Sequence, residues 1–289
     1  MAKTISEWLT KRYPTAKRQT LKRMVEAGRV RVNDRPAKTL KDPLAAGDRV
    51  TVDESPAKAQ RSIPEGLRII FEDADILVAD KPAGLLTSTV PRELRPTLLA
   101  KVREYVLSTE PRARVGLIHR LDRDASGLLI FSKSDLAYQS LKTQFFKHTV
   151  RREYTAIVHG TPRPAKGTIE TRVTERTDGT VHTTRQIGKG ELAITKYEVL
   201  KSEGGLSRLR VMLETGRKHQ IRVHLSERAT PIVGDSVYGK EGDKAPRLML
   251  AATRLTIRHP RDGKEMTFEI PPPGEFGEWD VDLKRVPET

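Results

Sequence analysis

The side chains best suited to chemistry are gathered in one short polar loop of the sequence. The loop holds five of them: His119, Arg120, Asp122, Arg123 and Asp124. Apolar runs flank it on both sides, and such runs are typical of buried strands that hold a loop rigidly. Charge held on a rigid, apolar scaffold is how a catalytic group is usually presented. A charged turn between two strands has the same composition, so the rest of the sequence must decide between these interpretations.

A second polar motif is Gly216-Arg-Lys-His-Gln-Ile-Arg222. Ile221 and Leu225 are four positions apart, which predicts a helix whose apolar face excludes Arg222. An arginine at the base of a helix can lock a buried carboxylate by a bidentate contact. Arg217 and Arg222 are equally compatible with ordinary surface charge, and the motif alone leaves both interpretations open.

The composition points to a globular protein that binds a polyanion. The chain has 289 residues and a formal net charge of +15. Such an excess of positive charge favours nucleic acid as a partner, with an anionic membrane surface as the weaker alternative. No apolar run approaches the roughly 18 residues needed to cross a bilayer, and the N-terminus lacks an apolar signal-peptide core. We therefore expect a cytoplasmic protein without membrane attachment.

No motif in the sequence indicates a metal site or a nucleotide-binding site. The chain has no cysteine, and its seven histidines are scattered. None of them has a metal-ligand spacing such as H-E-x-x-H. No Walker-type or G-x-G-x-x-G loop occurs either. We therefore expect neither a metal ion nor a nucleotide cofactor.

Positive charge is concentrated in the first 53 residues, which hold 13 Lys and Arg against 6 Asp and Glu. Thr4-Ile-Ser-Glu7 fits a capping box at the start of a helix, and a second, basic helix is expected from about Ala16 to Ala27. Short alternating strands should follow, with a turn at Asn33-Asp34. The segment is thus predicted to form a small α+β domain.

Residues 5–52 resemble the small RNA-binding domain (the αL motif) first seen in ribosomal protein S-four. The resemblance rests on the two helices, on Gly28-Arg-Val-Arg-Val-Asn33 and on Gly47-Asp48 before a closing strand. It implies an αL-type RNA-binding domain over residues 1–55. Its basic helix would bind phosphate through four cations: Lys17, Arg18, Lys22 and Arg23. Without the resemblance, a solvated helix face would explain these cations equally well.

Residues 56–66 have the composition of a linker, because large apolar residues are almost absent from them. Residues 67–289 are then expected to form a second domain. Two strands are predicted within Arg68–Asp80, joined by a tight turn at Asp73–Asp75. A helix should begin near Ser134 with three side chains inward: Leu136, Leu141 and Phe145. Further runs alternate like strands: Arg152–Val158, Ala193–Leu200 and Leu206–Leu213.

Taken in order, the motifs of this second domain resemble the RluA-type family of RNA pseudouridine synthases. The matching motifs are Lys81-Pro-Ala-Gly84, His119-Arg-Leu-Asp122 with Ser126-Gly127, Tyr154, Gly216–Arg222 and Pro231–Gly239. The resemblance spans about residues 66–272. It implies an α+β fold, the pseudouridine synthase fold, in which helices and loops flank a mixed and mainly antiparallel sheet.

The chain departs from the family pattern at several positions. Ala125 and Lys218 stand where the family usually has threonine, and Ala251 stands where it usually has histidine. The block after Gly84 also lacks a histidine that is often found there. These departures spare the presumed catalytic groups and concern the RNA contacts and the substrate site.

The resemblance implies that uridine in structured RNA is isomerised to pseudouridine. The glycosidic bond breaks, the uracil rotates, and carbon 5 of the base rejoins the sugar. One central carboxylate suffices, because the leaving base is also the returning nucleophile. By motif position this carboxylate is Asp122, with Arg222 keeping it ionised and Tyr154 packed on the base, where it could help to remove a proton. Asp122 could attack the sugar carbon or abstract a sugar proton.

Base flipping follows from the same resemblance, because a stacked uridine cannot enter a pocket until it leaves the stack. Arg120 matches the family residue that occupies the vacated space. His119, Arg123 and Asp124 are expected to support the loop or to contact RNA, and Arg217 is expected to contact RNA. The αL-type domain favours large-subunit ribosomal RNA over transfer RNA as the partner, and we expect the protein to be a monomer.

Two other functions are compatible with parts of the sequence. An RNA- or ribosome-binding factor could retain this fold without activity, although such a protein would have no reason to keep Asp122, Tyr154 and Arg222 together. An RNA glycosidase that releases the base would also use a carboxylate, but it does not fit the ordered family motifs.

Overall fold

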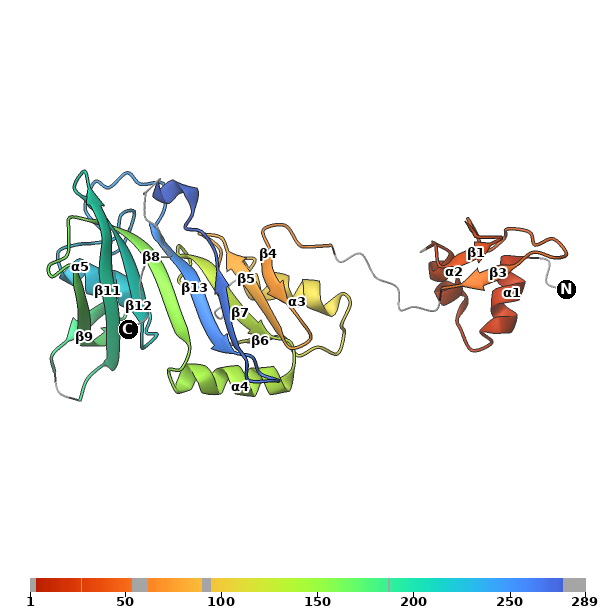
Figure 1. Ribbon diagram of the computed structural model, residues 1–289, viewed down its shortest axis with the longest axis horizontal. Coiled ribbons are helices and arrows are strands. Elements are labelled where there is room, and N and C mark those ends of the chain that lie inside the picture. Colours follow the sequence, from red (N-terminus) through yellow and green to blue (C-terminus); the bar gives the residue numbers. More distant parts are fainter. Residues whose placement is uncertain (1–3, 27, 54–61, 90–94, 187, 278–289) are drawn as a thin grey trace. The chain divides into compact units, whose positions relative to one another are not determined.

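The protein consists of two compact units, residues 1–61 and 62–289 (Figure 1). The computed structural model describes residues 4–26, 28–53, 62–89, 95–186 and 188–277. Residues 56–61 of the expected linker, Ala27 of the expected basic helix and the C-terminal segment from residue 278 lie outside the described residues. Each unit is described by itself.

The first unit packs two helices against a three-stranded antiparallel sheet. Its elements are α1 (Ile5–Arg12), α2 (Arg18–Glu26), β1 (Val30–Val32), β2 (Arg35–Pro36) and β3 (Val50–Val52). The Thr4 hydroxyl accepts a hydrogen bond of 3.3 Å from the Glu7 N–H and caps α1, as the capping box predicts. Asn33 and Asp34 have φ of 49° and 66°, which suits the tight turn between β1 and β2. The core of the first unit is formed by Ile5, Leu9, Leu21, Val25, Val30 and Ala37.

The second unit is built on an eleven-stranded sheet with the order β10-β9-β11-β12-β8-β13-β7-β5-β4, to which β14 adds beside β13 and β6 beside β7. The strands are β4 (Arg68–Glu72), β5 (Ile76–Lys81), β6 (Gly116–Leu117), β7 (Ser126–Ser132), β8 (Arg151–His159), β9 (Lys166–Glu175), β10 (Val181–Thr184), β11 (Glu191–Glu203), β12 (Leu206–Leu213), β13 (Leu250–Arg258) and β14 (Glu265–Glu269). In the described part of the chain, β7 and β13 are the one parallel pair. The expected mixed, mainly antiparallel sheet is confirmed.

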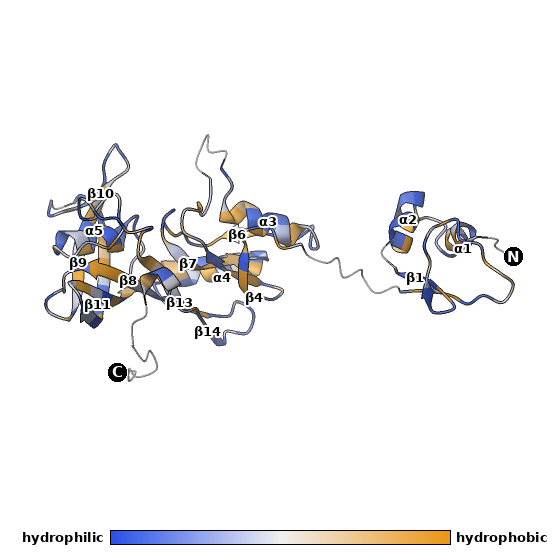
Figure 2. Ribbon diagram, turned by 90° about the horizontal axis from the view of Figure 1, so that it is seen from above, coloured by the Kyte–Doolittle hydropathy of each residue, from blue (hydrophilic) through white to orange (hydrophobic). Residues whose placement is uncertain are grey.

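Helices cover both faces of this sheet. They are α3 (Leu98–Leu107), α4 (Asp135–Phe146) and α5 (Gln220–Glu227), with a short 3₁₀ turn at Gly274–Phe276. Leu77 and Phe131 pack into a core with α3 and α5, whereas Val78 and Ile130 of the same strands pack on α4. The central strands are accordingly rich in hydrophobic residues, which are orange in Figure 2. Among the described helices, none combines the length and apolar character needed to span a bilayer.

The buried face of α4 differs from the expected one. Ala137 and Leu141 are fully buried, whereas Leu136 is 49% exposed. Because successive helical residues are about 100° apart, a face defined by Ala137 and Leu141 leaves Leu136 to one side. The prediction that Leu136 points inward was wrong.

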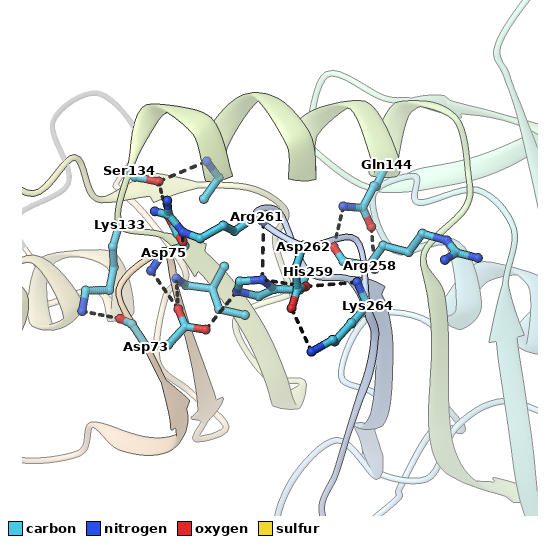
Figure 3. A network of polar contacts seen from close by, with 12 residues as sticks. Asp73, Asp75, Lys133, Ser134, Gln144, Arg258, His259, Arg261, Asp262 and Lys264 are labelled. Carbon is cyan, nitrogen blue, oxygen red and sulfur yellow. Dashed lines mark hydrogen bonds and ion pairs between the residues drawn. The ribbon is translucent and has the colours of Figure 1, made fainter.

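A polar network ties the β4–β5 turn and α4 to the β13–β14 hairpin (Figure 3). Arg261 donates to both carboxylate oxygens of Asp75, at 2.6 and 2.9 Å, and His259 contacts Asp73 at 3.0 Å. The Gln144 side chain exchanges two hydrogen bonds of 2.8 Å with the main chain of Arg258. The C-terminal end of α4 is therefore fixed against the sheet.

Gly127 permits the parallel pairing of β7 with β13. Its φ is 110°, and a side chain at this position would collide with the main chain of Ala252. Only glycine combines this backbone conformation with so close an approach. Gly127 therefore helps to position the loop that precedes β7, which carries the predicted catalytic carboxylate.

Candidate active site

A cavity of about 430 Å³ in the second unit gathers most of the predicted site residues. The loop between β6 and β7 contributes His119, Arg120 and Asp122, β8 contributes Tyr154, and α5 contributes Arg222. Among the described residues of this lining, Asp122 is the one carboxylate. Five cationic side chains share the cavity with it: Arg120, Arg152, Arg217, Lys218 and Arg222. Such a site suits a polyanion that presents a reacting group to a carboxylate.

Asp122 and Arg222 meet although 100 positions separate them in the sequence. Arg222 Nη1 lies 3.3 Å from Asp122 Oδ2, and the two side chains are 4% and 20% exposed. A cation at this distance offsets much of the cost of burying the carboxylate charge. Within the described residues, the carboxylate is thus held by one polar contact and still lines the cavity.

Asp235 holds the other side of the same guanidinium group. Arg222 Nε and Nη2 donate to the two oxygens of Asp235 at 2.8 and 2.7 Å, and the Asp235 side chain is fully buried. The main-chain N–H groups of Val237 and Tyr238 also donate to Asp235, at 2.9 and 3.0 Å. Burial raises the pKa of Asp235, but the bonds and charge of Arg222 together with the two main-chain bonds outweigh burial and lower the pKa. Burial alone would lower the pKa of Arg222, but the hydrogen bonds and charges of Asp235 and Asp122 outweigh burial and raise the pKa.

Two further side chains enclose Arg222. The guanidinium carbon lies 5.2 Å from the centre of the Tyr238 ring. The Tyr238 hydroxyl accepts a 2.7 Å hydrogen bond from the Val181 N–H and lies 2.9 Å from His219 Nδ1. His219 has φ of 52°, lines the cavity and directly precedes α5. Burial lowers the pKa of His219, whereas the charge of Asp122 opposes this shift.

The residues of α5 are more deeply buried than their spacing indicates. Arg222 is 4% exposed and His224 is 1% exposed, so the prediction that Arg222 avoids the buried side of the helix was wrong. Polar partners make this burial possible. The His224 ring nitrogens lie 2.9 Å from the Thr195 hydroxyl and 2.8 Å from the Thr171 hydroxyl. These contacts fix α5 to β11 and β9.

Tyr154 closes another side of the cavity. Its side chain is 6% exposed, and burial raises its pKa. In the part of the chain that the structure describes, no protein group hydrogen-bonds its hydroxyl. Tyr154 therefore presents a neutral phenol and an aromatic ring to whatever enters beside Asp122.

Comparison with known proteins identifies the family of the chain. The model described as RNA pseudouridylate synthase matches residues 75–227, more than half of the chain, and the S4 domain model matches residues 8–66. The chain belongs to the RNA pseudouridylate synthase family. The synthase assignment and the S4 domain agree with both resemblances found in the sequence.

Relatives extend over nearly the whole chain. Ribosomal large subunit pseudouridine synthase D of Neisseria meningitidis is 33% identical over 283 residues, which cover 93% of this chain and 75% of that protein. The protein of the same name from Haemophilus influenzae is 31% identical over 303 residues, covering 96% and 90%. The solved structure of human RNA pseudouridylate synthase domain containing 1 has a TM-score of 0.58 and 26% identity, and covers 73% of this chain and 84% of that one. The chain is thus an RluA-type RNA pseudouridine synthase, an isomerase with RNA as its partner.

The synthase supports the Asp122 loop from the segment after β5. The Lys81 ammonium is buried and donates to the carbonyl oxygens of Pro82, Leu85 and Arg123 at 2.9, 2.6 and 2.8 Å. Burial lowers the pKa of Lys81 to about 8, and the nearby carboxylates oppose this shift. In the sequence, residues 81–84 contributed to the family resemblance, but they gave no indication of this anchoring role.

Thr87 clamps the same loop one step further along. Its hydroxyl donates to the Leu121 carbonyl at 2.8 Å and accepts from the Leu121 N–H at 3.2 Å. The residue directly before Asp122 is therefore fixed through both of its main-chain groups. No motif in the sequence pointed to Thr87.

His119 packs inside the loop. Its Nε2 accepts a 3.3 Å hydrogen bond from the Ile130 N–H, and its ring stacks on Phe145 with 4.6 Å between centroids. Burial lowers the pKa of His119 to about 3, so the ring is neutral at physiological pH. This geometry favours loop support over a charged contact with phosphate.

The three remaining arginines differ in their partners. Arg120 is exposed and has no ion pair with the described residues. Arg123 lies outside the cavity lining and pairs with its neighbour Asp124 at 2.9 and 3.1 Å. Arg217 lines the cavity but pairs with Glu191 at 2.7 Å. Within the described residues, Arg120 therefore differs from Arg123 and Arg217 in having no ion pair to break before it binds a ligand.

The departures from the family pattern leave the Asp122–Arg222 pair intact. Ala125 is 2% exposed and lines the cavity, and Ala251 is fully buried beside Ser126. Lys218 also lines the cavity and pairs with Glu175. Ala125 and Lys218 thus form part of the cavity wall, whereas Ala251 lies behind it in the core.

The four cations predicted in the first unit are all exposed on or beside α2: Lys17, Arg18, Lys22 and Arg23. Arg18 and Lys22 line a second cavity of about 420 Å³, together with Lys38 and Lys41 from the loop before β3. Lys38 and Lys41 were not singled out from the sequence, because no local pattern relates that loop to α2.

Proposed function

We propose that this synthase converts uridine to pseudouridine in large-subunit ribosomal RNA, with Asp122 as its one reacting carboxylate. The observation that carries the proposal is the contact of Asp122 with the buried Arg222–Asp235 pair, in a cavity whose other charges are cationic. The names of the relatives from Neisseria and Haemophilus support the ribosomal substrate.

The reaction is an isomerisation, so its atoms balance within the nucleotide. The N1–C1′ bond breaks and a C5–C1′ bond forms, while C5 loses a proton and N1 gains one. Arg222 holds the Asp122 carboxylate against the sugar, where positive charge develops as the bond breaks. Water competes less with this contact, because the arginine is almost fully buried.

Tyr154 packs on the uracil ring in this proposal. Because burial raises its pKa, the hydroxyl stays protonated at neutral pH and is a poor proton acceptor. A packing role, with the hydroxyl donating a hydrogen bond to the base, agrees with this better than proton abstraction by a phenolate. The flat ring would keep the detached base close to the sugar while it rotates.

Base flipping brings the uridine to Asp122, and Arg120 fills the space that the base leaves. An exposed arginine without an ion pair can enter an RNA stack without breaking a protein contact. The first unit would hold the surrounding phosphates through Lys17, Arg18, Lys22 and Arg23, which adds affinity without reading sequence.

The test is to incubate unmodified transcripts of large-subunit ribosomal RNA and of transfer RNAs with the protein and to map pseudouridine. We expect modification at defined uridines of the ribosomal transcript and none with Asp122→Asn. Modification of transfer RNA alone would contradict the proposed substrate. Modification by Asp122→Asn at the wild-type rate would contradict the proposed role of the carboxylate.

A further inference from the structure

One aromatic side chain stands exposed at the rim of the cavity. Phe146 is 84% exposed, more than any other large apolar side chain in the described part of the chain, and it lines the cavity that holds Asp122. A ligand that covers this phenyl ring would remove its apolar surface from water, which is favourable. We propose that Phe146 stacks on a nucleobase of the RNA beside the target uridine, an inference that rests on the proposed function.

The end of α4 holds this ring in place. His148 has φ of 54°, and the N–H groups of His148 and Thr149 donate to carbonyls of the last turn at 3.2 and 3.0 Å. This is the Schellman arrangement that closes a helix in a defined direction. Gln144 is fastened to the Arg258 main chain by two bonds of 2.8 Å (Figure 3). Phe146 therefore stands on a fixed support, and little backbone freedom is lost when a base stacks on it.

The neighbouring phenylalanine connects this support to the reacting loop. Phe145 stacks on His119 with 4.6 Å between the ring centroids. The guanidinium carbon of Arg152 lies 5.5 Å from the centre of the Phe145 ring. Two successive rings at the end of α4 thus have different surroundings, one packed under the Asp122 loop and one in solvent. A base that stacks on Phe146 would be held at a defined place relative to that loop.

The surrounding charges favour RNA as the occupant. Arg120 and Arg152 line the same cavity, and Lys147 is exposed beside Phe146. Proteins usually bind an unpaired strand with cations that contact its phosphates and with aromatic rings on which its bases stack. Flipping the uridine disrupts the stack around it, so a neighbouring base becomes available to the ring.

The first experiment measures kcat and KM on the ribosomal transcript with Phe146→Ala, Phe146→Leu and Phe146→Tyr. Stacking predicts that Phe146→Ala raises KM roughly five- to a hundred-fold with little change in kcat, because the contact is the same before and during the reaction. Phe146→Tyr should restore KM, whereas Phe146→Leu should not, since it lacks a flat ring. The matched control is Leu136→Ala, which alters a 49% exposed side chain of the same helix outside the cavity. A KM within twofold of wild type for Phe146→Ala, or full restoration by Phe146→Leu, would overturn the proposal.

The second experiment reads the contact without catalysis. The indole introduced by Phe146→Trp should be quenched by a short single-stranded oligoadenylate that contains one uridine, after subtraction of the wild-type signal from Trp8 and Trp279. The indole introduced by Leu136→Trp should not respond. Absent or equal quenching at the two positions contradicts stacking. Quenching at position 146 without pseudouridine on any transcript would contradict the proposed function and leave the stacking contact standing.

A second copy of the chain is the competing occupant of the exposed ring. Sedimentation of the wild-type protein should show a monomer, with or without Phe146→Ala. A dimer that Phe146→Ala dissociates would show that a protein surface covers the ring, and this result would overturn the proposal.

Discussion

The two units of the synthase use positive charge in opposite ways. In the first unit, the four cations of the α2 region are exposed, and in the described residues the ion pair among them joins Lys22 to Glu26 at 3.3 Å, with both side chains more than half exposed. In the second unit, Arg222 is 4% exposed and contacts both Asp122 and Asp235. Exposed charges act nearly independently and are screened by salt, whereas a buried charge depends on each of its partners. Replacements should therefore give small graded effects in one unit and large, coupled effects in the other.

The largest effect on activity is expected from replacing Asp122. Asp122→Asn keeps the shape of the side chain and removes its charge, so pseudouridine formation should fall on the order of 10⁴-fold or more. Binding of the RNA should change little, because the many phosphate contacts remain. Single-turnover rates and filter binding with the same transcript separate the two quantities. A comparable loss of binding would mean that Asp122 acts mainly in RNA recognition.

A second large effect should follow from removing the buried partner. Asp235→Ala leaves the Arg222 charge without its bidentate partner, and the free energy of unfolding should fall by about 3–5 kcal/mol. Asp235→Asn should cost less stability but lower kcat more than it changes KM, because Arg222 then orients Asp122 less well. Urea denaturation and steady-state kinetics measure these effects.

The matched control for Asp235 is an exposed carboxylate with an arginine partner. Glu191 pairs with Arg217 at 2.7 Å, but its side chain is 68% exposed. Glu191→Ala should therefore change the free energy of unfolding by less than about 0.5 kcal/mol. Equal losses in Glu191→Ala and Asp235→Ala would remove the distinction between buried and exposed charge.

The sequence predicted this contrast only in part. The motifs around Asp122 and Arg222 indicated the two residues, because each motif is continuous along the chain. The deep burial of Arg222 and its pairing with Asp235 could not be predicted, since they require α5 and the loop after it to fold back onto β9 and β11. Lys81 illustrates the same limit. Its ammonium contacts the carbonyl of Arg123, a residue 42 positions away, which no local pattern encodes.

The exposed aromatic at the rim was also out of reach of the sequence. Alternation and helical spacing suggest which side chains face a core, and on α4 they favoured Leu136 over Ala137. A side chain that is left in solvent for a ligand breaks the rule on which such predictions rest. Phe146 follows Phe145 in the chain, and only the packed structure tells the two apart.

A medium effect on stability is expected from the buried histidine of α5. Burial lowers the pKa of His224 to about 4, whereas an unfolded histidine titrates near about 6.5. Between these values the unfolded chain binds a proton that the folded protein excludes. Stability is therefore complete above about pH 6.5 and falls toward pH 4, by up to about 1.4 kcal/mol per pH unit for this group.

His224→Gln should reduce this slope by up to that amount, as measured by urea denaturation at a series of pH values. His119 contributes in the same direction, since burial lowers its pKa to about 3, so part of the slope should remain. An unaltered slope in His224→Gln would mean that α5 opens before the histidine is protonated.

The smallest effect on fold and catalysis is expected from the exposed cations of the first unit. Lys22→Ala combined with Arg23→Ala should leave the free energy of unfolding within about 0.5 kcal/mol and should not change kcat. RNA affinity should fall, and the slope of log K against log salt should become shallower by about one unit for each lost phosphate contact. Lys11→Ala, an exposed cation on α1, tests whether any lost charge has the same effect. If the salt slope decreases by the same amount per removed charge in both variants, RNA affinity depends on the net charge of the unit. If the slope decreases only when Lys22 and Arg23 are replaced, α2 is the surface that binds the phosphate backbone.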